Sequence, residues 1–364
     1  MLRERGSDVW PRYSRACRLD VDRALRGQLV SPYRSNRKIG IGPRDDSHIA
    51  RFERALEGFY GVKHGIGMNS GTMALVAAIK ALRLPAGSEI IVPPYSFSAT
   101  VSAVILAGHT PRFADVDCNT FCLSAETVAK AATRKTRALV VVNLFGYVPD
   151  YKQFARFGLP IIEDAAQSQG VGGLNGVISC GSGNGSKNIP CVESGWAYTN
   201  DRQLAERMRL YISHQENFEE SEVGVNGRMH ELAAILALHG LRDVKERNEE
   251  RAEFASYIPR WNQFMGYYWL RGGRHAYYCV PMLYKLRSPS RATFVKRMNA
   301  MGVSCGAGYI TPSLEKYEAF KRYARGPLPV VTELSERTLV VFYEPFKGAE
   351  GGRKAAEAIR RAVR

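Results

Sequence analysis

The sequence has no long hydrophobic run. No apolar stretch reaches the ~18–20 residues that a membrane-spanning helix requires. The first residues of the chain carry charges of both signs and lack the apolar segment of a signal peptide. We therefore expect a cytoplasmic protein with no membrane partner.

Paired cysteines are missing as well. The seven cysteines include no C-x-x-C pair, and no histidine pair lies at zinc spacing. The odd count argues against a disulfide framework. We expect reduced, structural thiols and no metal site. The cysteines are Cys17, Cys118, Cys122, Cys180, Cys191, Cys279 and Cys305.

Acidic residues are fewer than basic ones. The chain has 35 Asp and Glu against 51 Lys and Arg, which gives a formal net charge of +16. Such an excess can indicate a nucleic-acid partner, but the basic residues are spread along the chain without a recognition helix, zinc finger or aromatic-plus-basic RNA motif. We expect no nucleic-acid partner and a surface suited to solvent or to anionic substrates. A nucleic-acid-binding module is the alternative, and it would require salt-dependent binding.

Apolar runs alternate with helix-like segments between about residues 66 and 214. This alternation predicts an α/β fold, with a mostly parallel sheet and helices on both faces. Helices are predicted over residues 72–84, 99–107, 124–133 and 201–213, and strands over residues 89–92, 112–116, 137–144, 159–163 and 197–199.

The C-terminal part has a shorter period. An apolar helix over residues 229–241 and a charged helix over residues 243–257 are predicted, with a basic helix near the C-terminus. We place a domain boundary near residue 246. This gives a large domain (residues 1–245, with an N-terminal extension over 1–45) and a smaller C-terminal α+β domain (residues 246–364).

Three segments lie where a doubly wound sheet collects ligands, at the carboxyl ends of strands. Residues 69–75 (NSGTMAL) form a small-residue turn that opens a helix, which is typical of a phosphate site but also of a capped core helix. Glu163 and Asp164 follow a β-branched strand, where a carboxylate can pair with a cationic ring nitrogen or merely cap the next helix. Residues 182–187 (SGNGSK) form a glycine-rich stretch that ends in Lys187.

The glycine-rich stretch has no nucleotide fingerprint. Ser186 replaces the third glycine of G-x-G-x-x-G, and the Walker order G-K-[ST] is absent. On spacing alone, a surface lysine in a glycine loop is as good an interpretation as a catalytic one.

The order of these segments resembles the DegT/DnrJ/EryC1/StrS family of sugar and cyclitol aminotransferases, which depend on pyridoxal 5′-phosphate (PLP). The resemblance runs from about residue 52 to residue 251. It rests on FERALEGFYGVKHGIGMNSGTMAL, SEIIVPPYSFSAT, AGHTPRFADVDCNTFCLS, IIEDAAQSQG, SKNIPCVESG and VNGRMHELAAILAL. It implies the fold type I of PLP-dependent transferases. Trp10, Tyr13 and residues 121–123 are faintly similar to the aminocyclitol and aminohydroxybenzoate members.

The resemblance also implies roles for individual residues. Lys187 matches the lysine that binds PLP as a Schiff base, and Asp164 matches the acid that pairs with the pyridinium nitrogen. The remaining matches are Gln167 beside the phenolic oxygen, Phe97 (or else Tyr95) stacked on the ring, Gly71, Thr72 and Ser182 around the phosphate, and Asn226 reaching the phosphate from the neighbouring subunit of a homodimer with shared active sites.

Two further residues are expected near the substrate. His214 lies where the family tends to have Asn-His-Gly, although a histidine at a helix C-terminus also interacts favourably with the helix dipole. Tyr309 matches a tyrosine of the family's small domain, although core packing explains it about as well.

The chain departs from the family pattern at its glycines. Gly181 and Gly183 flank Ser182 in place of aromatic residues, and the G-E-G-G turn becomes Val192-Glu-Ser-Gly195. We expect these changes to enlarge or loosen the pocket wall.

The resemblance implies an aminotransferase that moves an amino group from glutamate or glutamine to a keto-sugar, a cyclitol or a related ketone, in secondary-metabolite or sugar biosynthesis. The dehydratases of this family have histidine in place of the lysine, so Lys187 argues against that reaction. The alternative is a regulatory or partner-binding protein of the same fold that binds PLP with little turnover.

Overall fold

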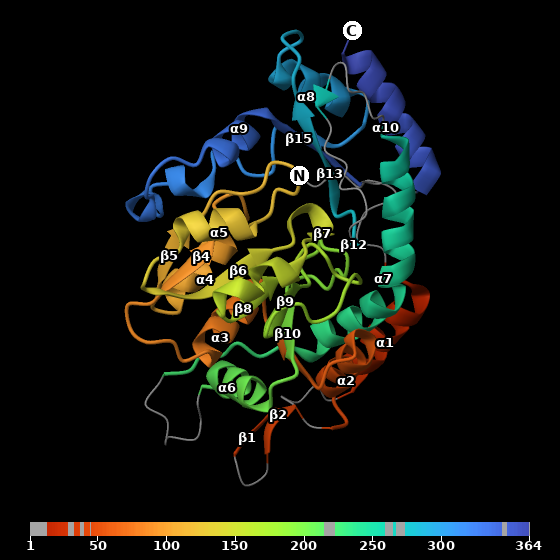
Figure 1. The fold of residues 1–364 in the computed structure, drawn as a ribbon. Coiled ribbons are helices and arrows are strands. Elements are labelled where there is room, and N and C mark those ends of the chain that lie inside the picture. The colour runs from red at the N-terminus through yellow and green to blue at the C-terminus, as the bar shows by residue number, and fades with distance from the viewer. Residues whose placement is uncertain are drawn as a thin grey trace.

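The computed structural model describes residues 13–27, 33–36, 40–43, 45–214, 223–258, 265–266, 274–343 and 348–363 (Figure 1). The helices are α1 (Arg15–Arg26), α2 (His48–Tyr60), α3 (Gly71–Ala81), α4 (Ser98–Leu106), α5 (Ala125–Ala131), α6 (Arg202–Ile212), α7 (Glu231–Tyr257), α8 (Arg291–Ala300), α9 (Pro329–Arg337) and α10 (Gly348–Ala362). The strands are β1 (Tyr33–Asn36), β2 (Gly40–Pro43), β3 (His64–Met68), β4 (Glu89–Val92), β5 (Thr110–Phe113), β6 (Thr136–Val142), β7 (Tyr147–Val148), β8 (Ile161–Asp164), β9 (Ile178–Ser182), β10 (Gly195–Thr199), β11 (Met265–Gly266), β12 (Arg274–His275), β13 (Cys279–Tyr284), β14 (Cys305–Gly306) and β15 (Thr338–Phe342).

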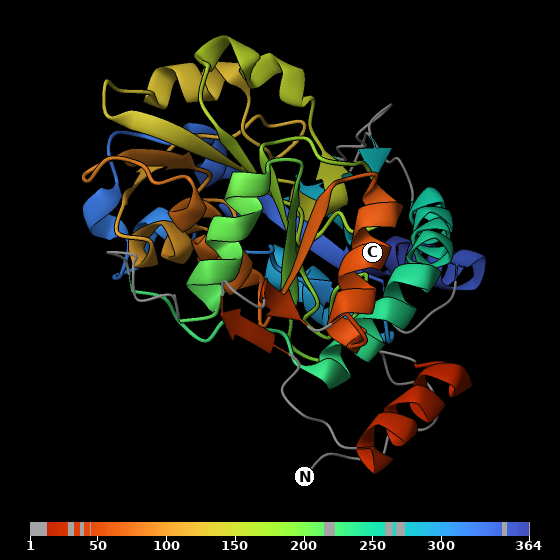
Figure 2. The same cartoon turned by 90° about the horizontal axis from the view of Figure 1, so that it is seen from below.

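The central sheet has seven strands in the order β3-β10-β9-β8-β6-β4-β5. Strands β5, β4, β6, β8 and β9 are parallel to one another, whereas β10 is antiparallel to both β9 and β3. Figures 1 and 2 show helices on both sides of this sheet. The predicted α/β fold with a mostly parallel sheet is confirmed.

Each face of the sheet has its own hydrophobic core. Successive side chains of a strand point to opposite faces, and β10 shows this directly. Ala197 packs in the cluster of α3, α4 and α6, whereas Trp196 and Tyr198 pack in the cluster of α2 and α7. Burial on both faces explains why these strands read as continuous apolar runs.

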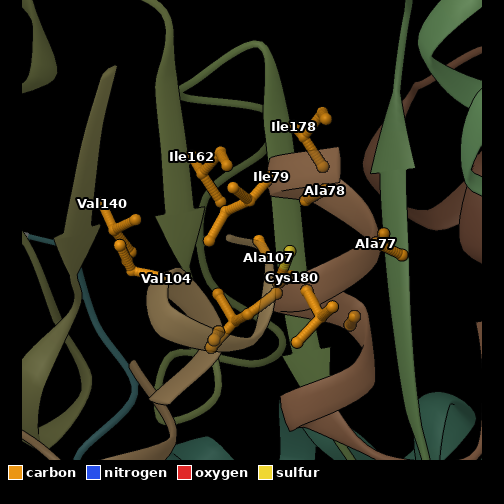
Figure 3. Packing of buried hydrophobic residues seen from close by; sticks show 14 of the residues in the cluster. Ala77, Ala78, Ile79, Val104, Ala107, Val140, Ile162, Ile178 and Cys180 are labelled. Carbon is orange, nitrogen blue, oxygen red and sulfur yellow. The ribbon is translucent and has the colours of Figure 1, made fainter. Parts of the chain in front are cut away.

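Helix α3 packs against the parallel strands through small side chains. Figure 3 shows Ala78 and Ile79 of α3 near Ile162 of β8 and Ile178 of β9, and Ala77 belongs to the same cluster. Alanine has no side chain beyond Cβ, so the helix axis can approach the sheet closely. This packing holds the N-terminus of α3 at the carboxyl ends of β8 and β9, where the candidate site lies.

Helix α7 differs from the prediction, because the two helices expected over residues 229–257 form one helix of 27 residues. No proline interrupts the sequence, and the glycine at position 240 fits because a Cβ there would lie 2.9 Å from Ile189 Cγ2. The C-terminal half of α7 packs with α8, α10 and the sheet β11-β13-β15-β14. The proposed domain boundary near residue 246 therefore falls inside a helix, and it stays a prediction.

Strand β9 was absent from the prediction, which placed a glycine-rich stretch over residues 182–187 and no strand before it. The structure pairs β9 with β8 and β10, so Ser182 ends a buried strand.

No helix in the described part of the chain is long and apolar enough to span a membrane. The seven cysteines are free thiols.

Candidate active site

A cavity of about 490 Å³ opens at the carboxyl ends of the parallel strands. Its wall combines the starts of α3 and α4, the ends of β6, β8 and β9, the hairpin between β9 and β10, and residues from the C-terminal part. The lining residues are Ser70, Gly71, Thr72, Leu75, Ser96, Phe97, Ala99, Thr100, Val142, Asp164, Ala166, Gln167, Cys180, Gly181, Ser182, Asn184, Ser186, Lys187, Glu193, Tyr278, Tyr309 and Ile310.

The N-terminus of α3 forms one end of the cavity. Ser70 caps the helix, and its Oγ accepts a hydrogen bond from Met73 N at 3.1 Å. The amides of Gly71 and Thr72 occupy the first turn, where N–H groups have no acceptor within the helix. Ser182 closes this corner so tightly that a Cβ on Gly71 would lie 2.8 Å from Ser182 Cβ. Glycine is therefore required here, and the corner offers converging donors for an anion.

Asp164 lies at the end of β8 and is 6% exposed. Its Oδ2 accepts a hydrogen bond from Thr100 Oγ1 at 2.8 Å, and its Oδ1 accepts one from Ala166 N at 3.2 Å. Burial raises the pKa of this carboxyl group above its ordinary value, while the Thr100 bond, the Ala166 bond and the charge of Lys187 act in the opposite direction. A cation in the cavity would compensate this buried carboxylate.

The neighbouring acid, Glu163, points to the other face of the strand. Its carboxylate accepts hydrogen bonds from Asn143 Nδ2 and Asn175 Nδ2, both at 2.7 Å. Glu163 does not line the cavity. Of the two acids singled out in the sequence, only Asp164 is placed to meet a ligand there.

Gln167 has a fixed orientation. Its Oε1 accepts a hydrogen bond from Phe145 N at 2.6 Å, and its Nε2 donates to the Tyr309 hydroxyl at 2.7 Å. Burial holds the pKa of the Tyr309 hydroxyl well above its ordinary value. The structure thus brings both predicted residues to the same wall of the cavity.

Of the two aromatic residues considered for stacking, Phe97 and not Tyr95 lines the cavity. Phe97 precedes α4, lines the cavity and is 56% exposed. Tyr95 is fully buried in a cluster with Phe121 and Phe145, at centroid distances of 6.3 and 6.4 Å. A residue so enclosed has no face free for a ligand.

Lys187 lies in a hairpin between β9 and β10. Backbone hydrogen bonds from Gly183 N to Ser194 O (2.8 Å) and from Gly185 N to Val192 O (2.9 Å) extend the two strands to the loop. Lys187 is partly buried, and its Nζ lies 4.6 Å from the centroid of the Tyr278 ring. The hairpin therefore directs the amine into the cavity.

The expectation of a loosened wall was wrong. A Cβ on Gly181 would lie 2.2 Å from Trp196 Nε1, and a Cβ on Gly183 would lie 2.1 Å from Cys191 Sγ. Trp196 and Cys191 are completely buried. The space of the missing side chains is therefore filled by Trp196 of the neighbouring strand β10 and by Cys191 of the hairpin.

The sequence profile of the DegT/DnrJ/EryC1/StrS aminotransferase family matches residues 38–349. The chain belongs to this family.

Individual relatives agree with the assignment. The chain is 30% identical over 355 residues to the UDP-N-acetyl-3-dehydro-alpha-D-glucosamine 3-aminotransferase of Acidithiobacillus ferrooxidans, which covers 92% of this chain and 95% of that protein. It is 34% identical over 220 residues to the L-glutamine:2-deoxy-scyllo-inosose aminotransferase of Streptomyces fradiae, covering 57% of this chain and 50% of that protein. The solved structure of the aminotransferase from Psychrobacter cryohalolentis has a TM-score of 0.86 at 26% identity and covers 97% and 98% of the two chains. The predicted family, fold and aminotransferase activity are confirmed.

PLP is the cofactor of the DegT/DnrJ/EryC1/StrS aminotransferases, as the resemblance implied. The cavity fits this group in three respects. It offers amides and a hydroxyl for a phosphate at the start of α3, an exposed aromatic side chain in Phe97, and the buried carboxylate of Asp164. An amine that could bind the aldehyde is present as Lys187.

Two residues matched to the family lie outside this cavity. Asn226 is exposed and pairs as an isolated bridge with Ser213, and Asn69 Nδ2 donates to its carbonyl at 3.2 Å. His214 follows α6, is exposed and has a φ of 63°. Neither lines the cavity of its own chain. Trp10 lies outside the described residues.

Several residues of the site were not found from the sequence. Thr100 was visible only as a letter of the segment SFSAT, with no sign that it bonds Asp164. Tyr278 had no signal at all, because a loop more than 90 positions beyond Lys187 in the chain brings it there. Contacts between segments so far apart are set by the tertiary fold.

Proposed function

We propose that this aminotransferase binds PLP covalently through Lys187 and transfers an amino group from glutamate or glutamine to a keto-sugar, a cyclitol or a related ketone in a biosynthetic pathway. The observation that carries the proposal is that Lys187 and Asp164 line one cavity with the anion-binding start of α3. Bound PLP carries the amino group and withdraws electrons from the reacting carbon.

Different residues of the chain would bind different parts of PLP. The amides of Gly71 and Thr72 and the hydroxyl of Ser182 would hold its phosphate. Asp164 would keep the proton on the ring nitrogen, and the Thr100 bond turns its carboxylate into place.

The remaining residues act at the ring and at the substrate. Phe97 would cover one ring face, and Gln167 would present its amide to the phenolic oxygen. Lys187, once its amine is free, would take the proton from the substrate carbon and return it.

The relatives support two classes of acceptor. Similarity along nearly the whole chain to an enzyme named for a UDP-linked sugar favours a nucleotide-linked keto-sugar, and similarity over 220 residues to a scyllo-inosose aminotransferase favours a keto-cyclitol. The net charge of +16 suits an anionic substrate and so favours the nucleotide-linked sugar.

The test of the function is a two-step assay on the PLP-loaded protein. Glutamate, glutamine and alanine are added separately, and the visible absorbance of the lysine-bound cofactor is followed. We expect glutamate or glutamine to bleach it, and a UDP-linked keto-sugar or a keto-cyclitol to restore it. If no donor bleaches the absorbance, the chain is the regulatory PLP-binding protein instead.

We also propose that the active protein is a homodimer whose subunits share their sites. Asn226 is exposed and outside its own cavity, which leaves its side chain available to a second copy. His214 lies beside it, so a subunit that contributes Asn226 to a neighbouring cavity would bring His214 near as well. Tyr309 would contact the substrate within its own chain.

A mixed dimer tests the sharing. One chain carries Lys187→Ala, the other carries Asn226→Ala, and two different affinity tags isolate the heterodimer. Shared sites place both lesions in one pocket, so about half of the wild-type activity should remain. Loss of one charge-assisted hydrogen bond to a phosphate costs roughly 1.5–3 kcal/mol, so Asn226→Ala homodimers should bind PLP weakly at both sites. Two impaired pockets in the mixed dimer would show that Asn226 acts within its own chain.

A further inference from the structure

Tyr278 enters the cavity from the C-terminal part of the chain. It lies directly before β13, is 9% exposed and lines the same wall as Lys187. The Lys187 ammonium lies over its ring, 4.6 Å from the centroid. No role for this residue follows from the assignments above.

Tyr278 makes three hydrogen bonds, two through its backbone and one through its hydroxyl. Its backbone N donates to Phe145 O at 3.0 Å, and its carbonyl accepts from Arg251 Nη1 at 3.0 Å. Its hydroxyl lies 3.2 Å from the hydroxyl of Ser186, the residue directly before the lysine. The backbone of Tyr278 is thus tied to α7, and its hydroxyl is tied to the lysine hairpin.

The carboxylates around the cavity are engaged elsewhere. Asp164 is bonded to Thr100 and Ala166, and Glu193 accepts a hydrogen bond from Asn184 Nδ2 at 2.6 Å. The Lys187 ammonium lies against the face of Tyr278, and its charge also acts on the Asp164 carboxyl group.

An aromatic ring is a suitable contact for a lysine that alternates between a free state and a state bonded to the cofactor. It stabilises an ammonium group through its quadrupole, but it has no lone pair that would compete for the proton as a carboxylate does. The amine is held close to the cavity and can still be released.

We infer that Tyr278 is a positioning residue that holds the free Lys187 ammonium over its ring whenever the lysine is not bonded to the cofactor. The inference rests on the proposed function, because it assumes that Lys187 alternates between a bonded and a free state. Tyr278 is hydrogen-bonded to Arg251 and directly precedes β13. The position of the lysine therefore depends on the packing of the C-terminal part of the chain.

The experiment uses the full chain without cofactor, so it does not depend on activity. Lysines are acetylated at a fixed pH with an amine-reactive ester, and the rate at Lys187 is measured by peptide mass spectrometry relative to exposed Lys130. Tyr278→Leu removes the ring, Tyr278→Phe keeps the ring and removes the hydroxyl, and Ser186→Ala removes the hydroxyl's partner.

Loss of the ring should free the amine. From the usual strength of a cation–π contact, Tyr278→Leu should raise the relative rate by about 2- to 30-fold, whereas Tyr278→Phe and Ser186→Ala should stay within about twofold of the wild type. An unchanged rate in Tyr278→Leu, or an equal rise in Tyr278→Phe, would overturn the inference.

A measurement on the wild-type protein covers the case in which Tyr278→Leu does not fold. Lysine amines are dimethylated with ¹³C-formaldehyde and a borohydride reductant, and the resonance of Lys187 is assigned from its absence in Lys187→Arg. Ring current should shift it upfield of the other lysines, and an ordinary shift would contradict the contact. If the shift is present but Lys187 does not bind PLP, the contact stands and the proposed function fails.

Discussion

Replacement of Lys187 by alanine is expected to abolish covalent binding of PLP and to lower turnover by about 10⁴-fold, the upper end of the range for loss of an acid–base group. The variant loses both the bond to the cofactor and the amine that moves the proton. The protein should stay folded, because Lys187 is partly exposed in a hairpin whose backbone bonds do not use its side chain. Visible absorbance of the loaded protein and single-turnover rates with glutamate measure the two losses.

A matched control is Lys245→Ala. Its Nζ also lies over an aromatic ring, 5.3 Å from the centroid of Phe59, but on the outer face of the sheet and away from the cavity. We expect wild-type absorbance and turnover from this variant. A Lys187→Ala protein that keeps a covalent PLP adduct reducible by borohydride would refute the assignment of the lysine.

Replacement of Asp164 by asparagine should leave PLP bound yet slow turnover by about 10²–10⁴-fold, which corresponds to roughly 3–5 kcal/mol of transition-state stabilisation. The amide keeps the size of the side chain and can still accept the Thr100 hydrogen bond, but it has no charge to hold a proton on the ring nitrogen. The measurements are the dissociation constant of PLP and kcat at saturating donor.

Glu163→Gln is the control for this variant. Glu163 is equally buried, but its carboxylate bonds Asn143 and Asn175 on the far side of the strand. We expect this change to lower the thermal midpoint without a matching loss of kcat. Near-normal turnover in Asp164→Asn, together with a large loss in Glu163→Gln, would exchange the roles of the two acids.

The sequence predicted those features that depend on local patterns. The alternation of apolar runs with helical segments predicted the parallel sheet. The strand predicted over residues 159–163 and the helix predicted over residues 72–84 correspond to β8 (Ile161–Asp164) and α3 (Gly71–Ala81). These features depend on neighbours in the chain, such as a Ser70 cap or a β-branched strand, and so they are visible in a short window.

Two predictions that depended on Gly181 were wrong. Strand β9 was missed because Gly181 weakens the strand pattern, and the same glycine suggested a loose wall. In the structure Gly181 makes room for Trp196 from the neighbouring strand β10. No window of sequence shows which side chain will fill the space beside a glycine.

In the turn after Lys187, a residue with a side chain replaces a glycine of the family pattern. Val192 stands where the family pattern has glycine, and it adopts a φ of 66°. A β-branched residue in this left-handed region is uncommon and costs conformational energy. The turn thus keeps a conformation that glycine favours, although valine occupies the position. The hairpin is therefore preserved despite this departure from the family pattern.

Locating the cofactor on the chain shows which lysine binds it. The protein is loaded with PLP, reduced with borohydride and digested, and the modified peptide is sequenced by mass spectrometry. We expect one pyridoxyl group per chain, on Lys187. A pyridoxyl group on any other lysine, or none at all in protein that retains PLP, would contradict it.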